Sequence, residues 1–194
     1  MKLGYFFVEG VPDTGNDRGR TYQEHSNALL DLSGGFQKGC LSGFVMWEGR
    51  WLGEANGEDA EFGGRIEEGY LRLKFHKFFT EVGRESLWWG PGRHGALLVS
   101  NNAFPFDIVR IGNDEPFMLP GLLSHLGLIS LEAFLTELED DRDFPDALLM
   151  GMRVNFNLTP NLDVGFLRTA MFGGAGRNVT LSTIWDVILS LIHI

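Results

Sequence analysis

The stretch Leu148-Leu149-Met150-Gly151-Met152-Arg153-Val154-Asn155-Phe156-Asn157-Leu158 decides the fold of this chain. Every second residue is apolar, and this period of two predicts a β-strand. The run is long for a globular strand but matches the roughly 9 to 11 residues of a tilted strand that crosses a bilayer. We predict that Arg153, Asn155 and Asn157 face a lumen and that the opposite side faces lipid. That apolar side consists of Leu148, Met150, Met152, Val154, Phe156 and Leu158.

A second alternating run follows at once. Thr159-Pro160-Asn161 has the composition of a turn, and Gly173-Gly174-Ala175-Gly176 ends the run. One side of the run carries Leu162, Val164, Phe166, Arg168, Ala170 and Phe172, and the other carries Asp163, Gly165, Leu167 and Thr169. The two runs are therefore predicted to form an antiparallel hairpin.

Fainter strand patterns occur earlier in the chain. They cover residues 1–9, 28–36, 41–51, 70–79, 78–84, 96–100, 104–111 and 130–138. Two turns of helix at 131–138 are a weaker alternative. Roughly nine or ten strands result. A sandwich has shorter strands, whereas a barrel accepts long ones and removes the edges. We predict an all-β, antiparallel transmembrane β-barrel, as part of a larger one.

The composition supports an all-β chain and excludes several functions. Glycine accounts for 26 of 194 residues, with 16 Phe and 5 Trp, which is typical of many turns and bends. The net charge of −10 disfavours nucleic acid as a partner, because phosphate backbones need clustered Lys and Arg. Cys40 is the single cysteine, so it forms no internal disulfide and no metal site built on cysteine pairs.

The N-terminus lacks the features of a signal peptide, since Met1-Lys2 is followed by no apolar core and no cleavage site. No apolar run approaches the roughly 18 to 20 residues of a transmembrane helix. We therefore expect either a cytoplasmic protein or a chain whose beginning is missing.

The densest candidate site is Trp88-Trp89-Gly90-Pro91-Gly92-Arg93-His94-Gly95. One interpretation is sugar contact, because indole rings stack on sugar faces and Arg93 offers charged donors. The other is a packed, bent loop that fixes the shape of a barrel, with Gly90, Pro91 and Gly92 setting the bend. We favour the structural interpretation.

A second candidate is the acidic run Glu139-Asp140-Asp141-Arg142-Asp143. Calcium binding, or glycoside hydrolysis by a carboxylate pair, is compatible with its composition. A solvated loop in which Arg142 pairs with a neighbouring carboxylate is the interpretation we favour.

No other motif indicates catalysis, a cofactor or a metal. The five histidines show no ligand spacing such as i and i+4, and no nucleophile elbow, phosphate loop or dinucleotide fingerprint occurs. The residues by themselves predict no enzyme, no cofactor and no metal.

Several segments in order resemble the Wzi capsule-assembly family. They begin with Glu85-Ser86-Leu87-Trp88-Trp89-Gly90-Pro91-Gly92-Arg93-His94-Gly95 and Leu97-Leu98-Val99-Ser100-Asn101-Asn102-Ala103. They continue with Phe134 to Leu138 and the acidic turn, Leu149 to Val154, Thr159-Pro160-Asn161-Leu162 and Phe172-Gly173-Gly174. The resemblance covers roughly residues 66–177. The segments Trp89-Gly90-Pro91-Gly92 and Ser100-Asn101-Asn102-Ala103 together make it fairly specific.

The resemblance implies a lectin-like outer-membrane β-barrel of Gram-negative bacteria that holds capsular polysaccharide and is not an enzyme. Its implied partners are surface polysaccharide and outer-membrane lipid, and the oligomeric state stays open. Candidate polysaccharide-binding residues are Trp88, Trp89, Arg93, His94, Asn101, Asn102 and Arg142.

The family barrel is larger than this chain, so we interpret the chain as a fragment. Residues 1–185 are expected to belong to one barrel domain, and 186–194 to a non-native or disordered tail. Two alternatives remain open: a general outer-membrane porin or adhesin, and a soluble β-rich glycan hydrolase that uses Glu139, Asp141 or Asp143.

Overall fold

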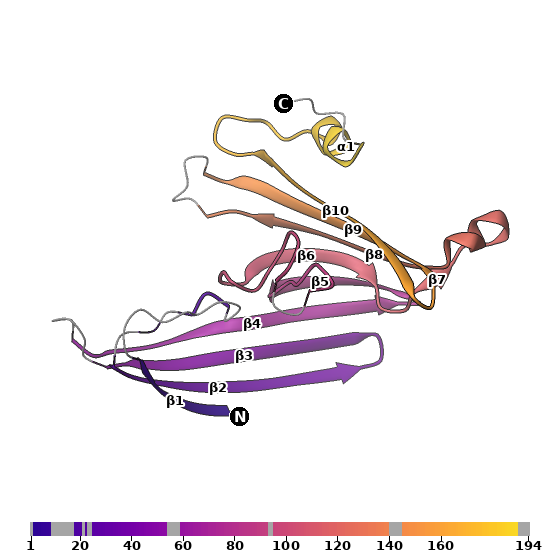
Figure 1. The fold of residues 1–194 in the computed structure, drawn as a ribbon. Helices are drawn as coiled ribbons and strands as arrows, with labels where there is room; N and C mark the ends of the chain where they lie inside the picture. The colour runs from indigo at the N-terminus through magenta and orange to yellow at the C-terminus, as the bar shows by residue number, and fades with distance from the viewer. Residues whose placement is uncertain are drawn as a thin grey trace. The chain divides into compact units, whose positions relative to one another are not determined.

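The computed structural model describes residues 2–8, 18–20, 22, 25–53, 59–92, 95–139 and 145–189. Its strands follow one another in the order β1-β2-β3-β4-β5-β6-β8-β9-β10, with β7 beside β8 (Figure 1). This up-and-down order is the connectivity of a β-barrel wall. The chain divides into two compact units, Met1–Lys74 with Glu81–Asp107 and Phe75–Thr80 with Ile108–Ile194, which we describe separately.

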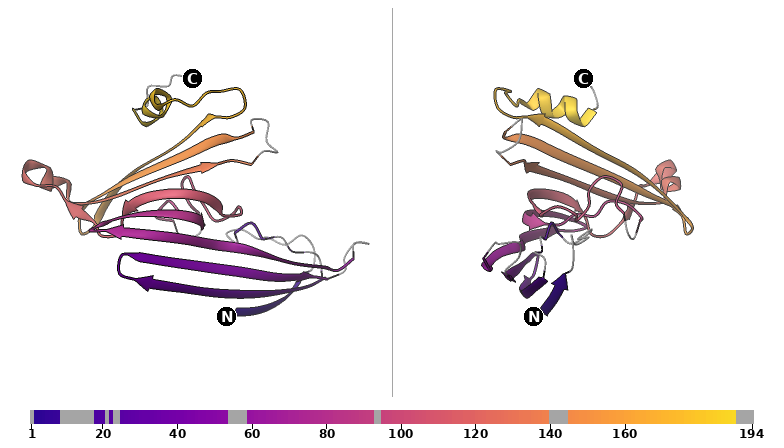
Figure 2. Two further views of the ribbon diagram at one scale, coloured as in Figure 1. Left: turned by 180° about the vertical axis from the view of Figure 1, so that it is seen from behind. Right: turned by 60° about the vertical axis from the view of Figure 1, so that its left-hand side comes forward.

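The first unit holds three whole strands and most of two more, since Phe75 of β4 and the first three residues of β5 belong to the second unit. They are β1 (Lys2–Val8), β2 (His25–Lys38), β3 (Leu41–Leu52), β4 (Glu61–Phe75) and β5 (Phe78–Glu85). Strands β2, β3 and β4 lie side by side and antiparallel (Figures 1 and 2). The pairing of β2 with β3 continues to Lys38 and Leu41, so two residues close the turn, and Gly39 there has a φ of 60°.

Strands β2 to β4 have one apolar and one polar face. Successive side chains of a strand point to opposite sides, so large exposed apolar residues at alternate positions share one face. This apolar face carries Leu32, Phe36, Leu41, Val45, Trp51, Phe62, Ile66, Leu71 and Leu73. The opposite, polar face carries Asp31, Glu48 and Arg65, which the register places in one row across the strands.

A β-bulge interrupts β4 on the polar face. Met46 opposes Glu68 and Trp47 opposes Ile66, so Glu67 is an extra residue in the ladder. A bulge redirects side chains locally. As a result Glu67 and Glu68, although adjacent in sequence, both reach ion-pair partners.

The second unit holds the remaining strands and two helices. They are β6 (Phe106–Asn113), β7 (Phe117–Met118), the 3-10 helix η1 (Gly121–Leu126), β8 (Leu128–Glu137), β9 (Ala147–Thr159), β10 (Leu162–Gly173) and α1 (Leu181–Leu189). Two residues of β6 belong to the first unit and three of β5 belong to the second. None of the helices in the described residues is long and apolar enough to cross a membrane.

The predicted hairpin of β9 and β10 is confirmed. Thr159 opposes Leu162 at the turn, and the pairing continues to Ala147 and Gly173. Phe166 opposes Val154, and its ring also meets that of Phe156 edge-on at 6.2 Å between centroids. From Leu148 to Phe156 the predicted apolar residues therefore lie on one side of the strand, whereas the register shifts at Leu158.

The other side of β8 and β9 is polar. Glu132 lies between two arginines, with its carboxylate 3.5 Å from Arg110 Nη1 and 2.7 Å from Arg153 Nη2. The ring of Phe134 covers Gly151, so a side chain there would collide with it. The contacts of Glu132 with Arg153 and of Phe134 with Gly151 are cross-strand pairs set by the register of β8 and β9.

Three sequence expectations need comment. Residues 96–100 do not form the predicted strand; they belong to the irregular connection between β5 and β6. The helical alternative at 131–138 is wrong, because this segment pairs along β8 with β9. Residues 186–189, expected in the tail, form the end of α1, whose first turn is capped by Thr180 Oγ1 accepting from the Thr183 amide.

Replacing Val154 by Arg tests which side of β9 faces lipid. We expect a loss of about 2–4 kcal/mol if the site lies at mid-bilayer, because lipid cannot solvate the guanidinium. Asn155→Arg on the opposite face is the matched control and should cost far less. Urea unfolding of both variants in micelles measures the difference, and equal losses would contradict the lipid-facing assignment.

Candidate functional site

The connection between β5 and β6, residues 86–105, contains most of the sequence-predicted site. It starts with a close backbone pairing: the Trp89 amide donates to Val99 O at 2.9 Å, and the Leu97 amide donates to Trp89 O at 2.8 Å. The Trp89 side chain is only 1% exposed. Trp89 is therefore the packing centre of this connection and presents no open ring face.

The glycines of this connection are required by close backbone approaches. Gly90 has a φ of 150°, and a Cβ there would lie 2.9 Å from the amide nitrogen of Leu97. A side chain at Gly92 would collide with the carbonyl of Gly95. Trp88 Nε1 donates to Gly92 O at 3.0 Å and closes the bend. These contacts agree with the structural interpretation of Gly90, Pro91 and Gly92.

The remaining candidates lie in different surroundings. Asn101 and Asn102 follow the paired segment, and Asn102 is exposed with its amide 3.4 Å from Ser100 Oγ. Trp88 is half-buried. Arg93, His94 and Arg142 lie outside the described residues. The described candidates thus share one connection of the first unit.

A short segment before β2, Arg18–Arg20, packs against the end of this connection. The Arg18 amide donates to Asn101 O at 2.6 Å. Gly19 has a φ of 65° and lies so close to the backbone of Phe104 that a Cβ there would be 2.5 Å from its amide nitrogen. Arg18 Nε lies 2.9 Å from Glu68 on β4. The segment therefore ties the connection to the polar face of the sheet.

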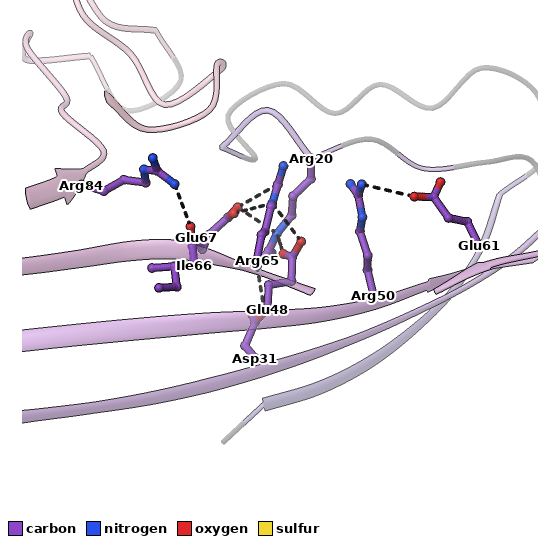
Figure 3. Close-up of polar contacts among 9 residues, drawn as sticks. All are labelled: Arg20, Asp31, Glu48, Arg50, Glu61, Arg65, Ile66, Glu67 and Arg84. Carbon is purple, nitrogen blue, oxygen red and sulfur yellow. Dashed lines mark hydrogen bonds and ion pairs between the residues drawn. The ribbon is translucent and has the colours of Figure 1, made fainter. Parts of the chain in front are cut away.

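Arg20 of this segment joins four charged side chains of the sheet. We call this group the arginine–carboxylate cluster: Arg20, Asp31, Glu48, Arg65 and Glu67 (Figure 3). Arg20 Nε lies 2.5 Å from Glu48 and 3.7 Å from Glu67, while Arg20 Nη2 donates to Asp31 at 2.9 Å. Arg65 Nε lies 2.8 Å from Glu67 and 3.5 Å from Glu48. Each arginine thus bridges carboxylates from different strands.

The cluster is costly to bury and therefore depends on complete pairing. The side chains of Glu48 and Glu67 are 1% and 0% exposed. Two buried carboxylates at close range repel each other, and each loses several kcal/mol of hydration. Arg20 and Arg65 offset both the repulsion between the carboxylates and their loss of hydration. Removing either arginine therefore leaves uncompensated buried charge.

Phe104 links the connection to the same cations. The Arg65 and Arg84 guanidiniums both lie over its ring, with their Cζ atoms 4.6 and 4.8 Å from the ring centroid. Arg84 also donates to both carboxylate oxygens of Asp107, at 2.8 and 2.5 Å. The planar guanidinium suits both contacts. This end of the connection is held in place by two arginines.

The sequence interpretation missed the arginine–carboxylate cluster and Arg18. Charged residues inside apolar strands, namely Asp31, Glu48, Arg65 and Glu67, were the available signal. Their mutual contacts depend on the strand register and on the bulge, neither of which a single sequence provides. Among the described residues no group of three or more His, Cys, Asp or Glu is arranged to hold a metal ion.

A family model and a curated relative match this chain. Residues 8–192 match the family model described as capsule assembly protein Wzi. A curated Klebsiella pneumoniae protein, described as an uncharacterized 55.8 kDa protein in the cps region, is 26% identical over 149 residues. That match covers 71% of this chain and 29% of the relative.

A solved structure shares the fold. It is described as Wzi, an outer membrane protein involved in group 1 capsule assembly in Escherichia coli and a carbohydrate-binding β-barrel. The TM-score is 0.72 at 22% identity, and the match covers 95% of this chain and 41% of that one. The prediction of a partial antiparallel β-barrel is confirmed. The chain spans less than half the length of either relative.

Gly90→Val should lower the amount of folded protein. The substitution places a branched side chain at a φ of 150° and against the Leu97 backbone, a strain of about 1–3 kcal/mol. Gly95→Val is the matched control, because nothing lies within 4 Å of a Cβ there. Heat-modifiable migration of the folded protein measures the effect, and equal folding of both variants would count against a fixed bend.

Arg20→Met should destabilise the first unit by about 3–5 kcal/mol, because it leaves buried carboxylates without one of their two cations. Arg177→Met, at an exposed position, is the control. Urea unfolding in micelles is the measurement. A change below about 1 kcal/mol, the range of exposed ion pairs, would show that the cluster does not depend on Arg20.

Proposed function

Because the chain belongs to the capsule assembly protein Wzi family, we propose that it is part of an outer-membrane β-barrel that binds or organises capsular or other surface polysaccharide without catalysis. The solved relative is described as an outer-membrane, carbohydrate-binding protein, and this supports the proposal. The observation that carries the proposal within this chain is the connection between β5 and β6, which is held rigid from below by arginines.

The lengths of the connections support an extracellular position for that site. Two-residue turns join β2 to β3, β4 to β5 and β9 to β10, whereas long segments join the opposite ends of these strands. Outer-membrane barrels have short periplasmic turns and long extracellular loops. The connection between β5 and β6 is one of the long ones, so we assign it to the cell surface.

Two roles are divided among the residues of this connection. Trp89, Gly90 and Gly92 shape it, since their contacts are internal. Half-buried Trp88 and exposed Asn102 remain as groups for a sugar, with stacking from the indole and hydrogen bonds from the amide. Arg93 and His94 belong to the proposed site as neighbours in sequence.

Rigidity is the physical advantage of this arrangement. A polysaccharide loses conformational freedom when it binds, so a loop that is already ordered avoids adding its own entropy cost. The ion pair of Arg18 with Glu68 and the contacts of Arg65 and Arg84 with the Phe104 ring support that order. The carboxylates beneath the loop are engaged by arginines, which disfavours a role in glycoside hydrolysis.

Arg93→Ala and Asn102→Ala test the site directly. Loss of a charged hydrogen bond costs about 1.5–3 kcal/mol, so the Kd for polysaccharide should rise about tenfold or more in Arg93→Ala. Arg177→Ala, an exposed arginine on the segment after β10, is the matched control. Retained polysaccharide is measured on cells with equal surface levels of each variant.

Unchanged retention in both loop variants would contradict the assignment of the site. Ion conductance of the reconstituted protein would favour the porin alternative instead. Release of free sugars from the polysaccharide would favour a hydrolase, with Glu139 and the undescribed Asp141 and Asp143 as its first candidates.

A further inference from the structure

A groove of about 820 Å³ crosses the first unit and meets the support of the β5–β6 connection only at Arg84 and Asp107. Its large walls are the side chains of Phe36, Val45, Ile66, Leu71 and Val82, which are between 46% and 54% exposed. This volume is typical of a small-molecule site, for which about 300–1,000 Å³ is usual. The groove therefore offers room for one ligand of lipid or drug size.

The groove lies on the apolar face of the sheet. Val45 is one residue from Met46 and three from Glu48, so strand alternation places it opposite the arginine–carboxylate cluster. Ile66 opposes Trp47 and shares the face of Val45. In an outer-membrane barrel this face meets lipid, so the groove opens toward the bilayer.

Glycines form the floor of the groove. Gly34 and Gly69 flank Val45 across three strands, in a single cross-strand row. A Cβ on Gly34 would meet nothing within 4 Å, and one on Gly69 would make ordinary contacts at 3.4 to 3.8 Å. Packing therefore does not require glycine at either position. Glycine inside a strand weakens it and often marks the close approach of a ligand.

The next row shows the contrast. Gly43 opposes Phe36 and Leu71, and a Cβ there would lie 2.5 Å from the Phe36 ring and 2.9 Å from Leu71. The chain fills the space above Gly43 with its own side chains. The space above Gly34 and Gly69 stays open between those same walls.

The polar end of the groove is formed by Arg84 and Asp107. Arg84 is the penultimate residue of β5 and Asp107 the second of β6, so the pair lies where the long connection starts and ends. Long connections are extracellular in such barrels. The pair is charge-neutral and hydrogen-bonding, which suits the ester, amide and hydroxyl groups where an acyl chain joins its headgroup.

We propose that this groove holds one acyl chain of lipopolysaccharide, the lipid of the outer leaflet of a Gram-negative outer membrane. The chain lies over Gly34 and Gly69, between Phe36, Ile66 and Val82, with its polar end at Arg84 and Asp107. The inference rests on the outer-membrane location in the proposed function. It shares Arg84 with the support of the β5–β6 connection but uses none of the proposed sugar-contacting residues. Under this proposal one lipopolysaccharide molecule binds at a defined site, in contrast to the lipids that surround the rest of the apolar face.

Gly34→Leu is the decisive variant, because a Cβ there meets nothing within 4 Å and the added side chain occupies the groove. Ala28→Leu adds the same side chain to the same face of the same strand outside the groove. Both proteins are purified from outer membranes in mild detergent, and native mass spectrometry counts the lipids retained by each. Lipid A and phosphatidylethanolamine are then added back separately as probes.

We expect one retained lipopolysaccharide in the wild type and in Ala28→Leu, and loss of most of it in Gly34→Leu. Added lipid A should restore the wild-type adduct, and phosphatidylethanolamine should not. Equal retention in both variants, or equal binding of both probes, would overturn the proposal. So would a dimer that Gly34→Leu alone dissociates, because a second copy would then occupy the groove.

Membrane fractionation and polysaccharide retention, measured on the same variants, separate this inference from the proposed function. Unchanged polysaccharide retention with lost lipid supports the groove and leaves the proposed function intact. Absence of the wild-type protein from the outer membrane would overturn both. Retained lipid in Gly34→Leu, with normal membrane location, overturns the groove alone.

Discussion

The polar face of the first unit depends on Arg20 and Arg65, two cations that neutralise carboxylates buried by β2, β3 and β4. Glu48 and Glu67 are almost fully withdrawn from solvent and lie close to one another, an arrangement that is stable only with cations between them. Arg65 comes from the sheet, whereas Arg20 comes from a segment outside it. Folding of the sheet and placement of that segment are therefore coupled through charge.

The segment Arg18–Arg20 also contacts the connection between β5 and β6. Arg18 contacts Glu68 through its side chain and Asn101 through its amide, and Gly19 allows the backbone of Phe104 to approach. The candidate polysaccharide site is thus built on the cluster, although none of its own side chains belongs to the cluster. The order of the β5–β6 connection therefore depends on ion pairs of the sheet and of the segment Arg18–Arg20, which lie outside the connection itself.

Strand alternation explains why one sheet can carry both a charged cluster and an apolar groove. Residues an odd number of positions apart on a regular strand point to opposite faces, so Val45 and Glu48, three residues apart on β3, serve different environments. The bulge at Glu67 adds a carboxylate to the polar face, and Ile66 beside it remains on the apolar face. Glycines at Gly34 and Gly69 leave space on the apolar side that neighbouring side chains do not fill.

The sequence by itself determined the hairpin at residues 148–172, the family resemblance and the bend at Gly90 to Gly92. Each is written in local pattern: a period of two, a turn signal, or glycines where backbone approaches closely. Local pattern failed at residues 96–100, a mostly apolar segment whose backbone hydrogen bonds with Trp89 do not extend into a strand. Only the tertiary structure decided that Arg20 meets Glu48 and that Arg65 and Arg84 both contact the Phe104 ring. The physical reason is that these contacts join segments far apart in sequence, and strand register and a one-residue bulge set their distances.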